Sequence, residues 1–417
     1  MAWLFPTESF SGFGTSVLHK WGEPRVVHVC GANSSKLLQR VAEICPRGQP
    51  GVYALVNGRG ELYYLGKAKC LRSRLLGYFC PSSCKSKSGR LARLARSIWW
   101  EPVPDEFAAL LREQELIHRM APACNVRGMP GERSRVYLEM AGGSAPYLRA
   151  VRVNRSGAVR QWGPLSWTRR LREAVRAVNL YFRLRECPTP NPAMFPLQKS
   201  LPMIELMKDR PSGCLRLDLG LCLAPCMVGA NKKAYVAAVQ ECLLFLAGDT
   251  GPTLSLERQM LESALEMDYE RAAILRDRMQ SMTYLQSQLL RLKYAWEIDG
   301  VHAVLGPSGR ETWYLLYRGR VIEVMQRPKK KLVAVSNHAR MLRSPVENAA
   351  GSMIWDLSEI DQVLLVVSWL KKNAVRVGHR LWTCAEADNW VTDSTENLSL
   401  SSQNMAWENV ADSAGTV

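Results

Sequence analysis

An Asn-Gly pair at positions 57 and 58 separates two short apolar runs, GVYALV at 51–56 and ELYYLG at 61–66. Both runs are rich in β-branched and aromatic residues, which favour strands, and Asn-Gly is a preferred pair in tight hairpin turns. The sequence therefore predicts an antiparallel β-hairpin over 51–66. Because side chains alternate between the two faces of a strand, Tyr53 and Tyr64 can lie together near the open side of this hairpin.

Three helices are expected after the hairpin. They cover 67–79, the start of 88–100, where the helix runs into a strand, and 104–120. The third helix has Asp105 as its N-cap candidate and ends before Pro122. Together with the hairpin, these elements predict a small α/β unit of about 80 residues, which is a usual size for one domain.

The first part of this unit is strongly basic. Between Gly66 and Trp100 there are nine Lys or Arg residues and no Asp or Glu. A solvated helix face is the alternative interpretation, but such a face normally pairs its charges with acidic neighbours, so contact with phosphate groups is favoured. The whole chain has a formal net charge of +17, which predicts an acidic partner, nucleic acid before a membrane surface.

The chain shows no sign of export or membrane insertion. Its N-terminal residues lack the basic region and the continuous apolar stretch of a signal peptide, and the most apolar run, at 363–370, is too short to span a bilayer. We therefore expect a cytoplasmic protein without membrane contact. In that reducing compartment, metal ligation or burial is favoured over disulfides for the 12 cysteines.

Four cysteines flank a Pro-rich, irregular stretch, and four thiolates suit either Zn²⁺ or a [4Fe–4S] cluster. They are Cys187, Cys214, Cys222 and Cys226. Helices are predicted again from about 231, with an antiparallel helical hairpin at 254–285 that the pattern alone would assign to a core. A three-stranded meander is predicted over 300–326. Beyond Arg380 there are six acidic residues and no Lys or Arg, which predicts disorder.

These motifs resemble the UvrC family of GIY-YIG endonucleases. GVY ends at Tyr53 and YLG begins eleven positions later at Tyr64, and the match continues through GKAKCLRSRLLGYF and through 107–126. The sequence DYERAAILRDRM at 268–279 resembles the UVR motif. The resemblance covers most of residues 51 to 285. It implies an α+β multidomain protein whose architecture is closest to the short UvrC homologues of the Cho type.

The resemblance also implies an order of domains along the chain. They are an N-terminal extension (1–50), a small α/β GIY-YIG nuclease domain (51–130), a connecting α/β segment (131–186), a Cys-cluster segment (187–230), a helical region (231–290) with the UVR-like hairpin (254–285), a C-terminal region with the β-meander (291–380) and an acidic, disordered tail (381–417).

The family's catalytic residues fall on six positions of this sequence, with one carboxylate implied as the ligand of a Mg²⁺ or Mn²⁺ ion. The six are Tyr53, Tyr64, Lys67, Arg74, Tyr78 and Asn125, and the carboxylate is Glu113. Glu113 is selected over Glu115 because the family places its metal-binding Glu twelve residues before this Asn. Arg74 suits phosphoryl oxygens, and Tyr64 is implied as the base or the group that orients water.

Further contacts are predicted for DNA, for a cofactor and for a partner protein. The DNA-binding candidates are Lys69, Arg72, Lys85, Lys87, Arg90 and Arg93. The four cysteines resemble the UvrC cluster motif, which favours [4Fe–4S] and leaves zinc as the alternative. Outside its Ala-Leu-Met seam, the UVR-like hairpin is expected to pair with a UvrB-like helicase subunit through Glu270, Arg271 and Arg276.

The expected function is therefore that of a structure-specific DNA endonuclease in nucleotide excision repair, which hydrolyses a phosphodiester 3′ to a lesion in a complex of UvrB and DNA. Two other functions stay open. The first is a non-cleaving DNA-binding or scaffold protein that pairs with UvrB, which the intact catalytic set disfavours. The second is a GIY-YIG nuclease that acts outside repair, which the UVR-like hairpin disfavours.

Overall fold

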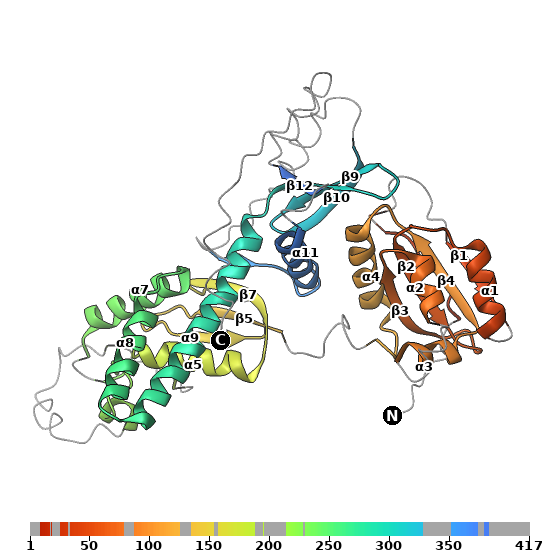
Figure 1. The fold of residues 1–417 in the computed structure, drawn as a ribbon. Coiled ribbons are helices and arrows are strands. Elements are labelled where there is room, and N and C mark those ends of the chain that lie inside the picture. Colours follow the sequence, from red (N-terminus) through yellow and green to blue (C-terminus); the bar gives the residue numbers. More distant parts are fainter. Residues whose placement is uncertain are drawn as a thin grey trace, which may run out of the picture.

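The structure is a computed structural model of the 417-residue chain. It describes residues 9–16, 18, 26–31, 34–78, 87–125, 135–153, 157–187, 195, 214–227, 230–327, 352–373 and 379–382. These residues form three four-stranded sheets with their helices. Figure 1 shows the first sheet at one end of the molecule, the second at the other, and the third between them.

The first sheet has the order β1-β4-β2-β3, and all its pairs are antiparallel. Its elements are β1 (Val27–Cys30), α1 (Ser34–Ile44), β2 (Gly51–Val56), β3 (Leu62–Ala68), α2 (Leu71–Gly77), α3 (Lys87–Leu94), β4 (Ser97–Pro102) and α4 (Glu106–Met120). The predicted boundary at residue 51 does not divide this fold. Strand β1 pairs along the edge of β4, and α1 buries Leu37 and Val41 in the same core as Tyr53.

The predicted hairpin is confirmed, because β2 and β3 pair antiparallel. Its loop is longer than a two-residue Asn-Gly turn. The Asn57 Oδ1 atom accepts hydrogen bonds from the backbone N–H groups of Arg59 (2.9 Å) and Glu61 (3.0 Å). With the loop held in this way, Gly60 adopts the positive φ of 79°, while Gly58 does not.

The second sheet has the order β11-β7-β5-β6. Its strands are β5 (Arg135–Met140), β6 (Leu148–Val151), β7 (Arg160–Ser166) and β11 (Met353–Ile354), and α5 (Arg169–Tyr181), α6 (Leu215–Asp218) and α7 (Lys232–Ala247) follow β7 along the chain. Strand β11 comes from the predicted C-terminal region and pairs parallel to β7. The predicted segments 131–186 and 291–380 therefore share one sheet.

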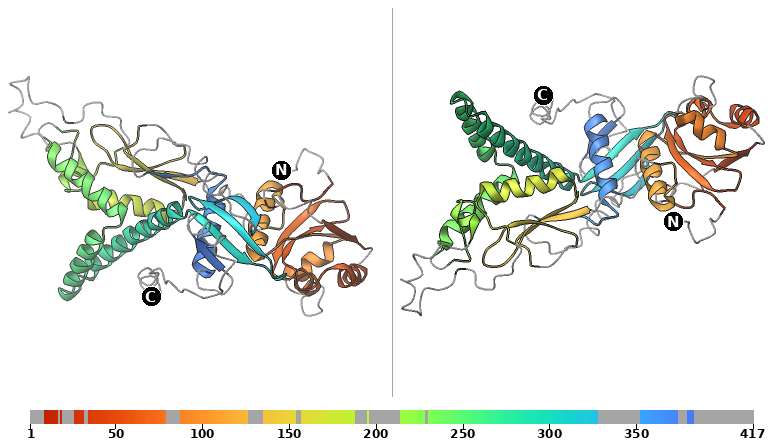
Figure 2. Two further views of the ribbon diagram at one scale, coloured as in Figure 1. Left: turned by 90° about the horizontal axis from the view of Figure 1, so that it is seen from above. Right: turned by 90° about the horizontal axis from the view of Figure 1, so that it is seen from below.

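Helices α8 (Gly251–Leu265) and α9 (Tyr269–Glu297) form the predicted helical hairpin. Helix α9 extends to Glu297, beyond the predicted end of the hairpin at 285, because its 29 residues contain neither Gly nor Pro. Figure 2 shows this pair projecting away from the sheets. Despite its length, α9 is not apolar enough to cross a membrane, and neither is any other helix in the described parts of the chain.

The third sheet has the order β10-β9-β8-β12 and is antiparallel. Its strands are β8 (Gly300–Leu305), β9 (Glu311–Tyr317), β10 (Arg320–Gln326) and β12 (His379–Trp382), and α11 (Ile360–Asn373) packs on it. The first three strands are the meander predicted over 300–326. Strand β12 reaches into the predicted tail, and the remaining tail lies outside the described residues.

Helix α4 joins the first sheet to the third. Leu116 and Ile117 pack on one face of the first sheet, whereas Phe107 lies in the core that includes Tyr314 of β9. The Tyr314 hydroxyl donates a 2.7 Å hydrogen bond to the carboxylate of Asp105, whose other oxygen caps α4 by accepting from the Ala108 N–H. The start of α4 is therefore fastened to the third sheet by a buried carboxylate.

Burial raises the pKa of Asp105 from 3.8 to about 6, although hydrogen bonds from Tyr314, Thr312 and the first turn of α4 oppose the shift. The folded protein therefore keeps a proton on Asp105 that the unfolded chain releases between these pH values. The stability linked to this proton is complete below pH 3.8 and is lost as the pH rises through 6.

We expect Asp105→Asn to remove this pH dependence, because the amide carries no charge and can still cap α4. Relative to the wild-type protein, its free energy of unfolding should rise by about 3 kcal/mol between pH 4 and pH 8. Urea unfolding at both pH values measures the difference. Asp299→Asn, at an exposed carboxylate, is the matched control, and equal pH profiles for Asp105→Asn and the wild type would contradict the prediction.

Candidate active site

Three tyrosines that the sequence singles out meet on one face of the β2–β3 hairpin. Tyr53 of β2 is fully buried, Tyr64 of β3 is half-buried, and Tyr78 follows α2. The hydroxyl groups of Tyr53 and Tyr78 are 2.8 Å apart, and the three ring centroids lie 5.8 to 6.4 Å from one another. Tyr53 and Tyr64, which were expected to lie together, therefore share this face with a third phenol, Tyr78.

Two glycines of the motif are required by close contacts. Gly66 lies opposite Tyr53 in the strand register, and a Cβ atom at position 66 would lie 2.5 Å from the Tyr53 hydroxyl oxygen. A Cβ atom at Gly51 would lie 2.4 Å from the carbonyl oxygen of Glu101 and 2.6 Å from Leu71. The tyrosine ring can cross β3 only because position 66 has no side chain.

Arg74 of α2 turns its guanidinium group toward the phenols. Its Nε atom donates to the Tyr53 hydroxyl at 3.3 Å, and its Cζ atom lies 5.4 Å from the centre of the Tyr78 ring. These contacts raise the pKa of Arg74, so it stays a cation. Burial is the main cause that raises the pKa of Tyr53 and of Tyr78, and both phenols keep their protons at neutral pH.

Glu113 of α4 faces β3. Its Oε1 atom accepts a 3.0 Å hydrogen bond from the backbone N–H of Lys67. Among the described residues, this is the one hydrogen bond of the Glu113 side chain. Burial raises the pKa of Glu113, while the charges of Lys67 and Arg74 lower it. Glu115, the rival carboxylate, instead accepts from Ser16 at 2.6 Å and pairs with Arg112 at 2.9 Å. The geometry thus separates the two carboxylates.

The amines of Lys67 and Lys69 have an acidic partner that the sequence analysis missed. They lie 3.3 Å and 2.8 Å from Glu106, in the first turn of α4. The composition of the basic run 66–100 gave no indication of Glu106, because this residue belongs to α4, which follows the run. A carboxylate pairing two Lys side chains at the mouth of the site reduces the positive charge that faces a phosphate.

Asn125 contacts the backbone of β3. Its side-chain oxygen accepts from the Leu65 N–H at 2.9 Å, and its side-chain NH₂ group donates to the Leu65 carbonyl, also at 2.9 Å. These bonds pair with β3 as a further strand would. The structure therefore places Asn125 at the outer edge of β3, the strand that carries Tyr64, in a position to hold that strand.

The basic residues predicted to bind DNA fall into three groups. Lys69, Arg90 and Arg93 are exposed, and the side chain of Arg72 donates to the Cys45 carbonyl at 3.1 Å. Lys85 and the side chain of Lys87 lie outside the described residues. A pocket of about 550 Å³ opens beside this surface, and its lining is Lys67, Ala68, Lys69, Cys70, Ser73 and Arg74. Cys70 and Ser73 were missed, although 70, 73 and 74 share one helix face.

The four predicted cluster cysteines are all free thiols in the described part of the chain, and only Cys222 is buried. Burial raises the pKa of Cys226, and the nearby Cys187 and Cys214 raise it further. Cys187 and Cys226 act in the same direction on Cys222. Within the described residues, however, no three potential ligands are arranged to hold a metal ion.

The helical hairpin exposes apolar side chains as well as the predicted charges. Glu270, Arg271 and Arg276 are exposed, and Arg276 pairs with Asp277 at 2.8 Å. The apolar residues near the turn between α8 and α9 are Leu265 (84% exposed), Met267 (75%), Tyr269 (67%) and Ile274 (59%). Such a group at one end of a helical pair is typical of a protein-binding surface. The sequence indicated this surface only through apolar residues, such as Leu265 and Ile274, that fall outside the packed seam of the two helices.

Comparison with known proteins identifies two segments. The family model of the UvrC-like GIY-YIG domain matches residues 49–126, and the UvrB/uvrC motif matches residues 254–282. UvrABC system protein C of Syntrophomonas wolfei is 29% identical over 276 residues, which are 65% of this chain and 43% of that protein. UvrABC system protein C of Desulfatibacillum aliphaticivorans is 33% identical over 233 residues, which are 55% of this chain and 36% of that protein.

This chain thus spans less than half of the length of these curated relatives. The GIY-YIG N-terminal endonuclease domain of UvrC from Thermotoga maritima, crystallised with magnesium as its catalytic divalent cation, is 31% identical. That match covers 22% of this chain and 98% of that domain, with a TM-score of 0.20. With the GIY-YIG segment on the first sheet and the UvrB/uvrC motif on α8 and α9, the chain belongs to the UvrC family.

Proposed function

We propose that this chain is a metal-dependent DNA endonuclease of nucleotide excision repair that cuts 3′ to a lesion in a complex of UvrB and DNA. The observation that carries the proposal is that Arg74 and the three phenols meet on one face of the β2–β3 hairpin, while Glu113 of α4 reaches the same strand β3 at the Lys67 N–H, near enough for the charge of Arg74 to lower its pKa, beside a basic pocket. Hydrolysis of a phosphodiester needs a cation at the leaving oxygen, a positive group for the phosphoryl oxygens and a group that orients water. The site offers a candidate for each.

Glu113 suits a Mg²⁺ or Mn²⁺ ion. Its Oε1 atom is held by the Lys67 N–H, which fixes the carboxylate and leaves lone pairs on both oxygens for a hard cation. A single protein carboxylate is enough, because Mg²⁺ retains several water ligands. When bound, the ion would supply Lewis acidity at the scissile phosphate.

The remaining groups act on the substrate through hydrogen bonds and charge. Arg74 remains protonated and presents a forked donor to the phosphoryl oxygens, where negative charge increases in the transition state. Tyr53 and Tyr78 share a hydrogen bond and keep their protons, so they are donors rather than bases. Tyr64, the most exposed of the three phenols, is our candidate to orient the attacking water. The exposed Lys69, Arg90 and Arg93 would hold the phosphate backbone beside the site.

We infer that the end of the α8–α9 pair binds the UvrB-like subunit. The apolar residues Leu265 and Ile274 would supply the buried contact, and Glu270 and Arg271 would select the partner by charge. Ile274→Ser is expected to abolish coprecipitation with UvrB and to leave DNA binding unchanged. Gln280→Ser, at an exposed polar position on the same helix, is the control; wild-type binding by Ile274→Ser would rule out this surface.

We further propose that Cys187, Cys214, Cys222 and Cys226 hold a [4Fe–4S] cluster, with zinc as the alternative. Support comes from the resemblance of the four-cysteine pattern to the family's cluster motif and from the effect of neighbouring cysteines on the pKa values of Cys222 and Cys226, whereas no arrangement of ligands within the described residues fits a metal ion as it stands. No catalytic step depends on this group. Protein purified without oxygen should be brown and contain iron, and Cys222→Ser should be colourless; zinc without iron would contradict the cluster.

The function is tested with the full chain and a duplex that carries one defined lesion. A single nick 3′ to the lesion is expected when both Mg²⁺ and UvrB are present, and none after addition of a chelator. Failure to cut under any condition, with DNA binding intact, would favour the scaffold protein. Equal cutting of undamaged DNA without UvrB would favour a nuclease that acts outside repair.

A further inference from the structure

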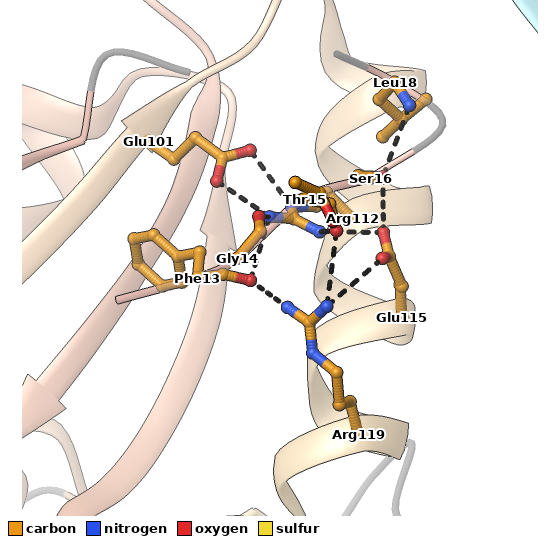
Figure 3. Close-up of polar contacts among 9 residues, drawn as sticks. All are labelled: Phe13, Gly14, Thr15, Ser16, Leu18, Glu101, Arg112, Glu115 and Arg119. Atoms are coloured by element: carbon orange, nitrogen blue, oxygen red, sulfur yellow. Dashed lines mark hydrogen bonds and ion pairs between the residues drawn. The ribbon is translucent and has the colours of Figure 1, made fainter. Parts of the chain in front are cut away.

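Arg112, the neighbour of Glu113 on α4, is a fully buried arginine whose N–H groups all have partners (Figure 3). It forms a forked ion pair with buried Glu101 of β4, with N–O distances of 3.0 Å and 3.1 Å. It also pairs with Glu115 at 2.9 Å. The other acceptors are backbone carbonyl oxygens from the N-terminal segment: Phe13 (3.1 Å), Gly14 (2.6 Å) and Thr15 (3.4 Å).

These carbonyls belong to residues 9–16, the N-terminal strap. It is anchored by apolar contacts as well. Phe13 is fully buried in the core between α4 and the first sheet, and Phe10 packs edge-on against Trp99 with ring centroids 5.2 Å apart. The Phe10 N–H donates to the Gly60 carbonyl at 2.9 Å. The strap thus connects the hairpin loop to α4.

Two further residues of α4 bind the strap. Arg119 donates to the carbonyls of Phe13 and Thr15, and Glu115 accepts from the Ser16 hydroxyl at 2.6 Å. Residues 112, 115 and 119 are spaced by three and four, so they form one stripe along α4. Glu113 lies next to this stripe and faces β3. Bonds along the stripe therefore restrain both the rotation of α4 about its axis and its shift along β3.

A buried guanidinium group cannot lose several hydrogen-bond partners without a large free-energy cost. The strap supplies three of the acceptors of Arg112, so α4 with an arginine at position 112 needs the strap in place. The family model of the GIY-YIG domain begins only at residue 49 and includes no part of the strap. This chain therefore holds its metal-binding helix through a segment outside the family domain.

We propose that the N-terminal strap and Arg112 position Glu113 for metal binding. Arg112 is a positioning residue: it does not touch the substrate, and it acts by fixing α4 at the depth where the Glu113 carboxylate meets the Lys67 N–H. The inference rests on the proposed function only in taking Glu113 as the metal ligand. A merely structural strap would affect the stability of the domain and leave metal affinity unchanged.

The test measures Mn²⁺ binding to the full chain by electron paramagnetic resonance, in parallel with thermal unfolding and DNA binding. Arg112→Lys keeps the charge but loses the forked geometry. Phe13→Ala removes the buried ring that anchors the N-terminal strap in the core. Both are expected to weaken Mn²⁺ binding by about tenfold, as loss of residues that support a metal ligand typically does. DNA affinity should stay within twofold of the wild type. Phe13→Leu, which keeps a large apolar side chain in this core, should retain most of the Mn²⁺ affinity that Phe13→Ala loses. Arg169→Lys, at an exposed arginine of α5, is the matched control.

Wild-type Mn²⁺ affinity in Phe13→Ala, with a lowered melting temperature, would overturn the inference, and this variant decides the outcome if Arg112→Lys does not fold. Failure of the proposed function has a different signature. In that case the wild-type protein itself would show no Mn²⁺ binding that Glu113→Gln abolishes.

Discussion

Replacing Glu113 with Gln is expected to lower the rate of nicking by about 10³-fold or more, because the metal ion contributes several kcal/mol to transition-state stabilisation. The amide has nearly the same shape and can still accept from the Lys67 N–H, so the fold and the strand contact should persist. DNA binding should be retained, since the exposed basic residues do not change. Single-turnover cleavage at saturating DNA, together with a binding titration, separates the two effects.

The matched control for this prediction is Glu173→Gln on α5, which removes a carboxylate far from the first sheet in the chain. Glu115→Gln is informative in another way. Glu115 binds Ser16 and Arg112, so its loss should disturb the strap and produce a smaller defect than the loss of Glu113. Full activity of Glu113→Gln would show that the metal ligand has been assigned to the wrong residue.

Replacing Arg74 with Ala is expected to lower the cleavage rate by about 10² to 10³-fold, the usual range for one preorganised donor to a developing negative charge. The loss should fall on the chemical step more than on DNA affinity, because the exposed Lys69, Arg90 and Arg93 remain available for the backbone. Arg74→Lys should recover only part of the rate. An ammonium group keeps the charge, but it cannot both stack on Tyr78 and present a planar fork.

Phosphorothioate substitution at the scissile phosphate measures this contact directly. The weaker acceptor should slow the wild-type protein and have little additional effect on Arg74→Ala, because the interaction is already lost. Arg96→Lys is the control for a basic residue of the same segment. In the wild-type protein, the Arg96 guanidinium group donates to the carbonyls of Arg93 and Ala95. An Arg74→Ala protein with the wild-type rate would contradict the role given to Arg74.

Several features of the site could be predicted because they depend on local spacing. Alternation along two strands predicted that Tyr53 and Tyr64 share a face, and their ring centroids are 6.2 Å apart. The twelve-residue spacing that the family places between its metal-binding Glu and the Asn selected Glu113 over Glu115, and of these two carboxylates it is Glu113 that contacts β3. Tyr63, next to Tyr64, is buried and donates to the Leu91 carbonyl at 2.6 Å, as a packing residue would.

Other features depend on which distant segments meet, and sequence spacing holds no information about that. The partner of Lys67 and Lys69 is Glu106 from the following helix, so the acid-free run from 66 to 100 overstated the free positive charge. The contact of the Asn125 amide with the Leu65 backbone was not predicted either. Strand β11 joins β7 from almost two hundred residues downstream, which no local pattern could indicate.

The β-hairpin, the helix that carries Glu113, the helical hairpin of α8 and α9 and the identity of the groups available for chemistry could all be read from the sequence. Residue type and periodicity decide these, because strand and helix preferences act over a few neighbouring positions. The burial of Arg112, the acceptors that residues 9–16 supply to it and the place of α4 between two sheets became visible only in the folded structure. A buried charge is stable only when acceptors from several segments meet around it, and that depends on the whole fold.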